Sequence, residues 1–384
     1  MDNRKIKVAI THGDTNGVGY EAILKALDDP TILEMFTPII YGSPKVASYH
    51  AKALGIEAQF SIINSINEAE DNRVNLLNCF DESDIKVEFG KATPESGAAA
   101  RQALDQSIAD YQNGGFDVLV TAPVSRTNIE GFHGHADYLS QKLGIAGKSI
   151  SMLMNDNLRV ALVTNNLAIK DIPESVTKQK IVEKGQLFHQ ALRRDLRISC
   201  PRIAILSLNP RCGEEGLLGE EEQEIIIPAV EELEQQGIQA FGPYAADSFF
   251  GRADYFYFDG VLAMYHDQGM IPFKTLAPED GIRFTAGLPI VRTAPAHGTH
   301  FDLAGRNQLD ASSMRQAIFF AIDAFRNRDN YDEPLQNPLQ KLYHEKRDES
   351  EKVRFRSKDI PKKQSSSSDE ISPKMDDVDN LQLR

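Results

Sequence analysis

The sequence predicts an α/β fold with a mainly parallel sheet. Short runs of buried-type residues, such as KIKVAIT at 5–11 and FDVLVTAP at 116–123, recur along the chain as expected strands. Longer segments with helical spacing of their apolar or small residues, such as 94–114, lie between them. Strands that alternate with helices are typical of parallel sheets, in which each connection crosses one face of the sheet.

The chain opens with a strand, a glycine-rich turn and a helix. The expected strand at 5–11 leads into HGDTNGVGYE at 12–21, and the helix follows at 21–29. Such a turn can offer backbone N–H groups and a helix N-terminus to an anion. Its glycines do not fit GxGxxG, and no GK[ST] follows, so it is neither the usual dinucleotide fingerprint nor a phosphate loop. A tight structural connection is an equally good interpretation, and His12 could be a site residue or a structural cap.

The following elements continue the alternation. We expect, in order, a strand at 37–43, a helix at 45–55, mixed short strands and turns at 60–92, a helix at 94–114, a strand at 116–123, a loop and helix at 131–144, a strand within 158–176, a helix at 176–196, and a strand, glycine loop and acidic helix within 201–237. Glu220, Glu221 and Glu222 fall in the first turn of that last helix, where the helix dipole favours acidic residues. We expect them on a solvated face.

Four expected strands end in polar residues. The ends are Thr121, Thr164-Asn165-Asn166, Asn209-Pro210-Arg211 and Tyr265-His266-Asp267. Open α/β sheets bind ligands beyond the carboxyl ends of their strands. The sequence therefore predicts a shared site there, and the stretch from Asp259 to Gly305 contributes most of its chemistry-bearing groups.

Bulk composition narrows the class of protein. The chain has 384 residues and a net charge of −14, which argues against a non-specific nucleic-acid binder. Its 3 cysteines make no disulfide framework, and no apolar run approaches the roughly 20 residues that span a bilayer. We expect a cytoplasmic protein that has neither nucleic acid nor membrane as a partner.

The C-terminal part differs from the rest. Residues 331–384 are polar, and KKQSSSSDEISPKMDDVDNLQLR at the end is of low complexity. So few aromatic and branched residues cannot bury enough surface to keep a chain ordered. We expect a polar tail at 331–384, disordered from about residue 345.

Several blocks of sequence resemble one enzyme family. They are ITHGDTNGVGYE (10–21), VLVTAPVSRTNI (118–129), LNPRCGEEGLLGEEE (208–222), GPYAADSFF (242–250) and LAMYHDQGMIPFKTL (262–276), extended by GLPIVRT (287–293) and HGT (297–299). In register over about residues 5–325, the chain resembles the 4-hydroxythreonine-4-phosphate dehydrogenase family of vitamin B6 biosynthesis.

The resemblance implies a fold, a reaction and an assembly. The fold is similar to that of the isocitrate and isopropylmalate dehydrogenases, with two α/β subdomains and a cleft between them, here about 1–130 with 285–330, and 131–284. The reaction is the oxidation of 4-(phosphooxy)-threonine by NAD (or NADP), followed by loss of CO₂ from the β-keto acid, in pyridoxal phosphate biosynthesis. The enzyme is a homodimer with its active site at the interface, and NAD binds without GxGxxG.

The resemblance also assigns roles to individual residues. The catalytic group is His266, Asp247 and Lys274. The phosphorylated substrate is bound at the positions of His135, Lys274, Arg283 and Arg292. The cofactor is bound at Gly13, Asp14, His297, Gly298 and Thr299.

The metal site departs from the family. A divalent metal (Zn, Mg or Co) is expected on three histidines, of which only His266 is present, since Asn166 and Arg211 occupy the other two positions. An amide is a poor ligand for such metals, and a guanidinium cannot bind a cation. Arg211 could instead place a fixed positive charge at the metal position and pair with a carboxylate or a phosphate.

Two alternatives therefore stay open. Ala136 and Arg283 stand where the family has Thr and Asn, which would suit a different phosphorylated hydroxy acid. The lost metal ligands would also suit a non-catalytic paralogue that binds a metabolite.

Overall fold

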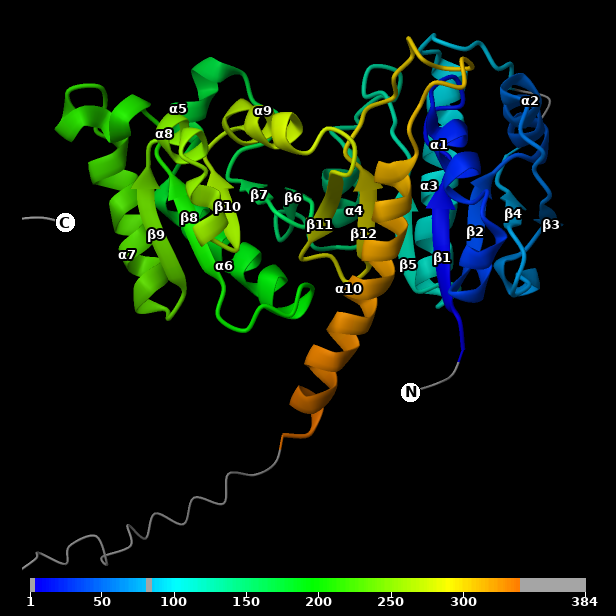
Figure 1. Ribbon diagram of the computed structural model, residues 1–384. Helices are drawn as coiled ribbons and strands as arrows, with labels where there is room; N and C mark the ends of the chain where they lie inside the picture. Colours follow the sequence, from blue (N-terminus) through cyan, green and yellow to red (C-terminus); the bar gives the residue numbers. More distant parts are fainter. Residues whose placement is uncertain (1–3, 81–84, 339–384) are drawn as a thin grey trace, which may run out of the picture. The chain divides into compact units, whose positions relative to one another are not determined.

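Twelve strands form one continuous sheet in the computed structural model, which describes residues 4–80 and 85–338 (Figure 1). The sheet order is β3-β4-β2-β1-β5-β12-β11-β6-β7-β10-β8-β9. The strands are β1 Ile6–Thr11, β2 Phe36–Gly42, β3 Ser61–Ile63, β4 Asn75–Asn78, β5 Val118–Thr121, β6 Ile150–Met154, β7 Arg159–Leu162, β8 Arg202–Leu206, β9 Gln239–Tyr244, β10 Gly260–Ala263, β11 Ile282–Ala286 and β12 Val291–Pro295.

Two blocks of parallel strands run in opposite directions within this sheet. The first block runs from β3 to β12, and the second from β7 to β9. Between them, β11 pairs antiparallel with both β12 and β6, and β6 pairs antiparallel with β7. The mainly parallel sheet is confirmed, but its strand ends do not share one edge. A typical twist of roughly 20–25° per strand would accumulate to roughly 100–125° over the five steps from β5 to β10, enough to bring the ends of the two blocks closer to one side.

Helices lie within or overlap the predicted ranges 21–29, 45–55, 94–114, 131–144, 176–196 and 201–237, whereas those at 172–175, 246–251, 266–276 and 312–336 were not predicted. The helices are α1 Gly19–Ala26, α2 Pro44–Leu54, α3 Pro94–Gln112, α4 His135–Lys142, α5 Ile172–Ser175, α6 Lys178–Arg194, α7 Ile227–Gln235, α8 Ala246–Gly251, α9 His266–Leu276 and α10 Ser312–Gln336. Local signals set their ends: Ser43 and Thr93 accept N-capping hydrogen bonds at α2 and α3, and Gly55 ends α2 in the left-handed conformation.

One face of the sheet carries an unbroken hydrophobic layer. Helices α1, α10, α6 and α7 cover it, and their apolar residues join alternate residues of the strands in one core. Figure 1 shows α10 running along β12, in front of the middle of the sheet. Because successive strand residues point to opposite faces, Ile282 and Phe284 of β11 enter this core while Arg283 points to the other face.

The opposite face carries two separate hydrophobic clusters. Helices α3 and α4 cover one cluster on the side of β1 and β5, and α8 and α9 cover the other on the side of β7 and β10. The middle strands lie between the two clusters, and there polar residues occupy this face of the sheet: Thr121, Ser151, Arg283, Thr285 and Arg292. The interruption of the second hydrophobic layer leaves room for a site.

Residues Met1–Asn337 form one compact unit, so the two subdomains drawn from the resemblance stay a prediction. Helix α10 continues to Gln336, into the segment predicted as a polar tail, and the part predicted as disordered lies outside the described residues. Among the described residues, no helix is both long enough and apolar enough to span a bilayer.

Candidate active site

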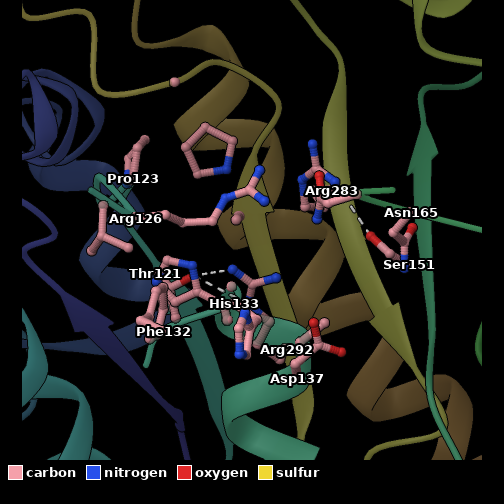
Figure 2. A pocket seen from close by; sticks show the side chains of 18 of the residues that line it. Thr121, Pro123, Arg126, Phe132, His133, Asp137, Ser151, Asn165, Arg283 and Arg292 are labelled. Atoms are coloured by element: carbon pink, nitrogen blue, oxygen red, sulfur yellow. Dashed lines mark hydrogen bonds between the residues drawn. The ribbon is translucent and has the colours of Figure 1, made fainter. Parts of the chain in front are cut away.

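A cavity opens where the second hydrophobic layer is interrupted (Figure 2). Its floor is the polar face of β5, β12, β11 and β6, and its walls come from the loop after β5, the start of α4 and the segments after β7 and β10. Six residues with predicted roles line it together: His135, His266, Arg283, Arg292, His297 and Gly298.

Arg292 is the most deeply buried charge in the cavity. The residue is 1% exposed, and its guanidinium donates to the hydroxyls of Thr121 (from Nε, 3.1 Å) and Thr285 (from Nη1, 3.0 Å). Within the described part of the chain no carboxylate pairs with it. Burial and the nearby charge of Arg283 lower the pKa of Arg292 to about 9. A buried cation without a counter-ion is costly, so this site calls for an anionic ligand.

Two further guanidinium groups face the same space. Arg283 is half-buried and donates from Nη1 to the hydroxyl of Ser151 at 3.3 Å. Arg126, in the exposed loop after β5, extends across the cavity toward Arg283 in Figure 2, and its charge contributes to the lowered pKa of Arg283. Asp137 is the one carboxylate among the described residues that line the cavity. With three arginines and one aspartate, the cavity has a positive net charge.

Helix α4 points its N-terminus at the cavity. Gly134 precedes the helix with φ of 131° and supplies no capping side chain, so the first N–H groups of α4 are left for another acceptor. His135 begins the helix beside the ring of Phe132, at 5.4 Å between ring centroids. Desolvation and the charges of Arg292 and Arg283 hold the pKa of His135 well below 6.5, so the imidazole is neutral near pH 7 and can donate one hydrogen bond.

Three of the four predicted strand ends meet at this cavity. Thr121, Asn165, Asn166 and His266 all line it, whereas the residues after β8 do not. His266 shares a 2.7 Å contact between its Nδ1 and Oδ1 of Asp267. This contact orients the ring.

The segment 297–298 supplies another unsatisfied group. Nδ1 of His297 contacts the carbonyl of Gly298 at 2.9 Å, while its buried Nε2 has no partner among the described residues. A Cβ added at Gly298 would meet open space. Burial, and to a smaller extent the charges of His300 and Lys274, lower the pKa of His297. Lys274 itself is exposed on α9 and does not line the cavity.

The glycine-rich turn at 12–19 is a closed connection. A Cβ at Gly13 (φ 76°) would lie 2.4 Å from the carbonyl of Pro123, and N–H of Asp14 donates to that same carbonyl at 2.9 Å. The carboxylate of Asp14 is buried and accepts from Asn128, Ser96 and the N–H of Asn16. The turn also donates from Val18 N to the carbonyl of Thr299. The polar groups of Asp14 and the carbonyl of Thr299 make their hydrogen bonds within the protein. The cofactor role of Gly13, Asp14 and Thr299 stays a prediction.

The segment after β8 forms a separate polar region. Arg211 lies in a left-handed turn within Pro210–Gly216, its side chain is exposed, and Nη1 pairs with Glu214 at 2.8 Å. Asp247 is exposed on α8 and close enough for its charge to act on Arg211. Neither Arg211 nor Asp247 lines the cavity. The carboxylate that pairs with Arg211 is Glu214, and the expectation that Arg211 places its positive charge at the metal position in the cavity is not met.

The expectation of a solvated acidic run is wrong for Glu222. This residue is 1% exposed, and its Oε1 accepts hydrogen bonds from the N–H groups of Leu208 and Asn209, each at 2.7 Å. The first turn of the acidic helix is a π-helix, Glu222–Ile226, rather than an α-helical turn. The carboxylate is needed inside because the loop after β8 has no strand partner for these two N–H groups.

The donor set does not fit the metal of the family. The cavity offers one family ligand, His266, together with the amide of Asn166, and Arg211 points elsewhere. Within residues 4–80 and 85–338, no three His, Cys, Asp or Glu side chains gather closely enough to hold an ion.

Arg126 and Ser151 are among the cavity residues that sequence reasoning missed. Arg126 follows a predicted strand by only a few residues, and a cation in a strand-end loop was the available signal. Ser151 belongs to β6, which was not predicted as a strand. In contrast, five residues with predicted roles do not line the cavity of a single chain: Gly13, Asp14, Asp247, Lys274 and Thr299.

Known proteins resemble the chain over most of its length. The model of the family described as pyridoxal phosphate biosynthetic protein PdxA matches residues 34–321. A 4-hydroxythreonine-4-phosphate dehydrogenase from Bacteroides thetaiotaomicron is 54% identical over 359 residues, covering 92% of this chain and 98% of the relative. One from Sulfurihydrogenibium is 40% identical, covering 83% of this chain and 98% of the relative.

Solved structures agree with the sequence relatives. The 4-hydroxythreonine-4-phosphate dehydrogenase of Klebsiella pneumoniae aligns with a TM-score of 0.71 at 27% identity, covering 84% of this chain and 100% of that one. The enzyme of Burkholderia phymatum aligns with a TM-score of 0.66 at 33% identity, covering 84% and 98%. These matches confirm the predicted α/β fold class. The chain belongs to the PdxA family, the 4-hydroxythreonine-4-phosphate dehydrogenases.

Proposed function

We propose that this chain oxidises 4-(phosphooxy)-threonine with NAD and releases CO₂ from the product, in pyridoxal phosphate biosynthesis. The observation that carries the proposal is Arg292, a buried guanidinium held by two threonine hydroxyls and lacking a carboxylate among the described residues. A phosphate supplies the missing negative charge and matches the planar fork of an arginine. The names of the relatives support the choice of reaction.

In this proposal the cavity residues bind the phosphate and thereby orient the reacting carbon. Arg292, Arg283, the neutral His135 and the start of α4 surround the phosphate. Binding energy from that remote group aligns the secondary alcohol with the cofactor, which lowers the barrier to the chemical step. His266, Lys274 and Asp247 remain the candidates for catalysis. The alcohol carbon loses a hydride and its hydroxyl a proton, and the carboxylate then leaves as CO₂.

The residues at 297–298 fit the cofactor. The unpartnered Nε2 of His297 and the open space beside Gly298 offer a polar contact and a surface that a flat ring can approach. A bound NAD (or NADP) would accept the hydride. The His297 imidazole, neutral because burial lowers its pKa, can position the nicotinamide without adding a charge.

A homodimer belongs to the same proposal. Asp247 and Lys274 have predicted catalytic roles but lie exposed outside the cavity. Large apolar side chains are also exposed in this half of the chain, among them Leu217, Phe256 and Ile271. A second copy that covers such residues would bring its exposed groups to the cavity of the first. The three free cysteines are consistent with a reducing, cytoplasmic location.

Formation of NADH from 4-(phosphooxy)-threonine tests the function. We expect turnover with this substrate and at least about 30-fold lower kcat/KM with 4-hydroxythreonine, because loss of the phosphate removes about 2–5 kcal/mol of charge pairing. Absence of turnover with NAD and NADP, in a protein that still binds inorganic phosphate, would overturn the enzyme assignment and favour the non-catalytic paralogue.

A second candidate is dehydrogenation of another phosphorylated hydroxy acid. Ala136 and Arg283 both line the cavity and depart from the family pattern, so the space and charge around the substrate are altered. A relative from Oceanobacillus iheyensis, 36% identical, is provisionally named a D-threonate 4-phosphate dehydrogenase. Comparison of kcat/KM for phosphothreonate, phosphoerythronate and 4-(phosphooxy)-threonine in one assay distinguishes the two candidates.

A further inference from the structure

We propose that this chain holds its substrate without a divalent metal, and that Arg283, assisted by Arg126, supplies the positive charge that grips the substrate. The inference rests on the proposed function, since it concerns the same cavity. It starts from the disagreement between the residues of this site and the metal of the family.

Formation of a homodimer does not restore the metal ligands of the family. Asn166 offers only an amide oxygen, and the guanidinium of Arg211 repels a cation. A second copy of the chain carries the same Asn166 and Arg211, so a homodimer does not restore either histidine at its own position. Of the family's three ligands His266 alone remains. The other histidines that line the cavity, His133, His135 and His297, do not form with it, among the described residues, a group of three close enough to hold an ion, whereas zinc needs at least three protein ligands.

The charges of the cavity also repel a metal cation. Arg126, Arg283 and Arg292 line it with a single carboxylate, Asp137, among the described lining residues. A divalent cation near these guanidinium groups would be repelled by each of them, and the repulsion is stronger in a partly buried site than in water. The same three charges attract a substrate that carries a phosphate and a carboxylate.

Arg283 is better placed than Arg211 to act in place of the metal. Its side chain lies in the cavity, is anchored by the hydroxyl of Ser151, and shares that space with His266 and Asn166. The side chain of Arg211 is 76% exposed and paired with Glu214. Arg283 therefore puts a fixed charge beside the residues that would otherwise surround the ion, and its fork can grip an oxyanion through two hydrogen bonds.

Arg126 completes the arrangement from the opposite wall. It comes from a loop rather than a strand, and Figure 2 shows its guanidinium directed toward Arg283. Within the described residues neither arginine has a carboxylate partner. Two like charges that face each other without a counter-ion are relieved by an anion between them, so the pair binds the phosphate of the substrate together with Arg292.

The test combines metal content with phosphate binding in the full-length protein. After dialysis against a chelator, elemental analysis should find less than about 0.1 metal ion per chain. Calorimetric titration with Zn²⁺, Mg²⁺ or Co²⁺ should show no stoichiometric binding. NADH formation should change less than about 2-fold on addition of chelator or metal. One tightly bound metal ion per chain would overturn the inference, whether or not the protein is active.

Variants test the role of the arginine. Arg283→Asn, which places the residue of the family there, should weaken inorganic phosphate binding by about 10- to 100-fold, as expected for loss of a charge-assisted contact. Arg126→Gln should weaken it less, and Arg73→Asn, a surface control, should leave it unchanged. Unchanged phosphate binding in Arg283→Asn would refute the role of Arg283.

Restoring the histidines provides a positive control. The variant Asn166→His/Arg211→His/Arg283→Asn should bind more zinc than the wild-type chain by elemental analysis. If it instead matches a wild-type chain that already holds one ion, the inference fails. Metal content and phosphate binding need no turnover, so an inactive protein with the metal and phosphate results expected here would overturn only the proposed function.

Discussion

Two polar regions of the molecule, the cavity and the segment after β8, were both predicted as parts of one site, and they satisfy their charges in opposite ways. After β8, Arg211 pairs with Glu214, and Glu222 accepts the N–H groups of Leu208 and Asn209. In the cavity, Arg292 has only hydroxyl partners in the described structure. The charged groups after β8 are paired within the chain, whereas the positive charge of Arg292 in the cavity needs a bound anion as its partner.

The difference teaches how to separate a binding site from a scaffold. Both regions are rich in charged residues, so composition does not distinguish them. A buried charge that has a partner holds the fold together, and a buried charge that lacks one lowers the stability of the ligand-free state unless a ligand binds. Removal of an unpaired charge should therefore impair binding, and removal of a paired charge should impair stability.

The largest effect is expected for Arg292→Met. Loss of the guanidinium removes a buried charge that faces the phosphate, so kcat/KM should fall by about 30- to 5,000-fold, equivalent to about 2–5 kcal/mol. Inorganic phosphate should raise the Tm of the wild-type protein and not that of the variant. Arg73→Met serves as the control. A variant that keeps the phosphate-dependent rise in Tm would show that Arg292 is not the anion site.

Glu222→Ala should act on stability and spare binding. It leaves two partly buried N–H groups without an acceptor. Each loss costs roughly 1–2 kcal/mol because the groups keep some access to water, so the free energy of unfolding should fall by about 2–4 kcal/mol in urea denaturation. Glu220→Ala, at an exposed neighbour, is the matched control. Loss of phosphate binding in folded Glu222→Ala would contradict the separation of the two regions.

The sequence predicts the cavity better than it predicts the scaffold. Arg292 and Arg283 belong to blocks that resemble the family, and period-2 alternation on β11 and β12 explains why they share one face with Thr121. The role of Glu222 could not be predicted, because an acidic residue at a helix start looks the same whether it faces solvent or a loop distant in the sequence.

The strand directions illustrate a second limit. Strand β6 was not predicted, and the antiparallel pairs that it makes with β7 and β11 reverse the direction of the second parallel block. Local residue patterns carry no information on such pairing, which is decided by long-range packing. Three of the four strand ends nevertheless meet at the cavity, and Asn209-Pro210-Arg211 lies elsewhere.

His12 tests whether an unpaired buried group always marks a ligand site. Both of its ring nitrogens lack partners among the described residues, yet it is 0% exposed and packed against Tyr20 and Phe80 rather than on the cavity. Burial lowers the pKa of His12 to about 3 and that of His50, beside it, to about 4, with 6.5 as the ordinary value. Both histidines are therefore neutral in the folded protein near pH 7, and no anion is needed there.

The pH dependence of stability follows from these lowered pKa values. Between about pH 6.5 and 4 the unfolded chain binds protons at both histidines and the folded chain does not. The free energy of unfolding should therefore fall as the pH decreases through this range, by up to about 1.4 kcal/mol per pH unit for each histidine. His12→Phe, which keeps an aromatic ring between Tyr20 and Phe80, should flatten the decrease measured by urea denaturation at several pH values. An equally steep decrease in the variant would mean that His12 accepts a proton in the folded state, and its neighbourhood would then become a candidate anion site comparable with the cavity.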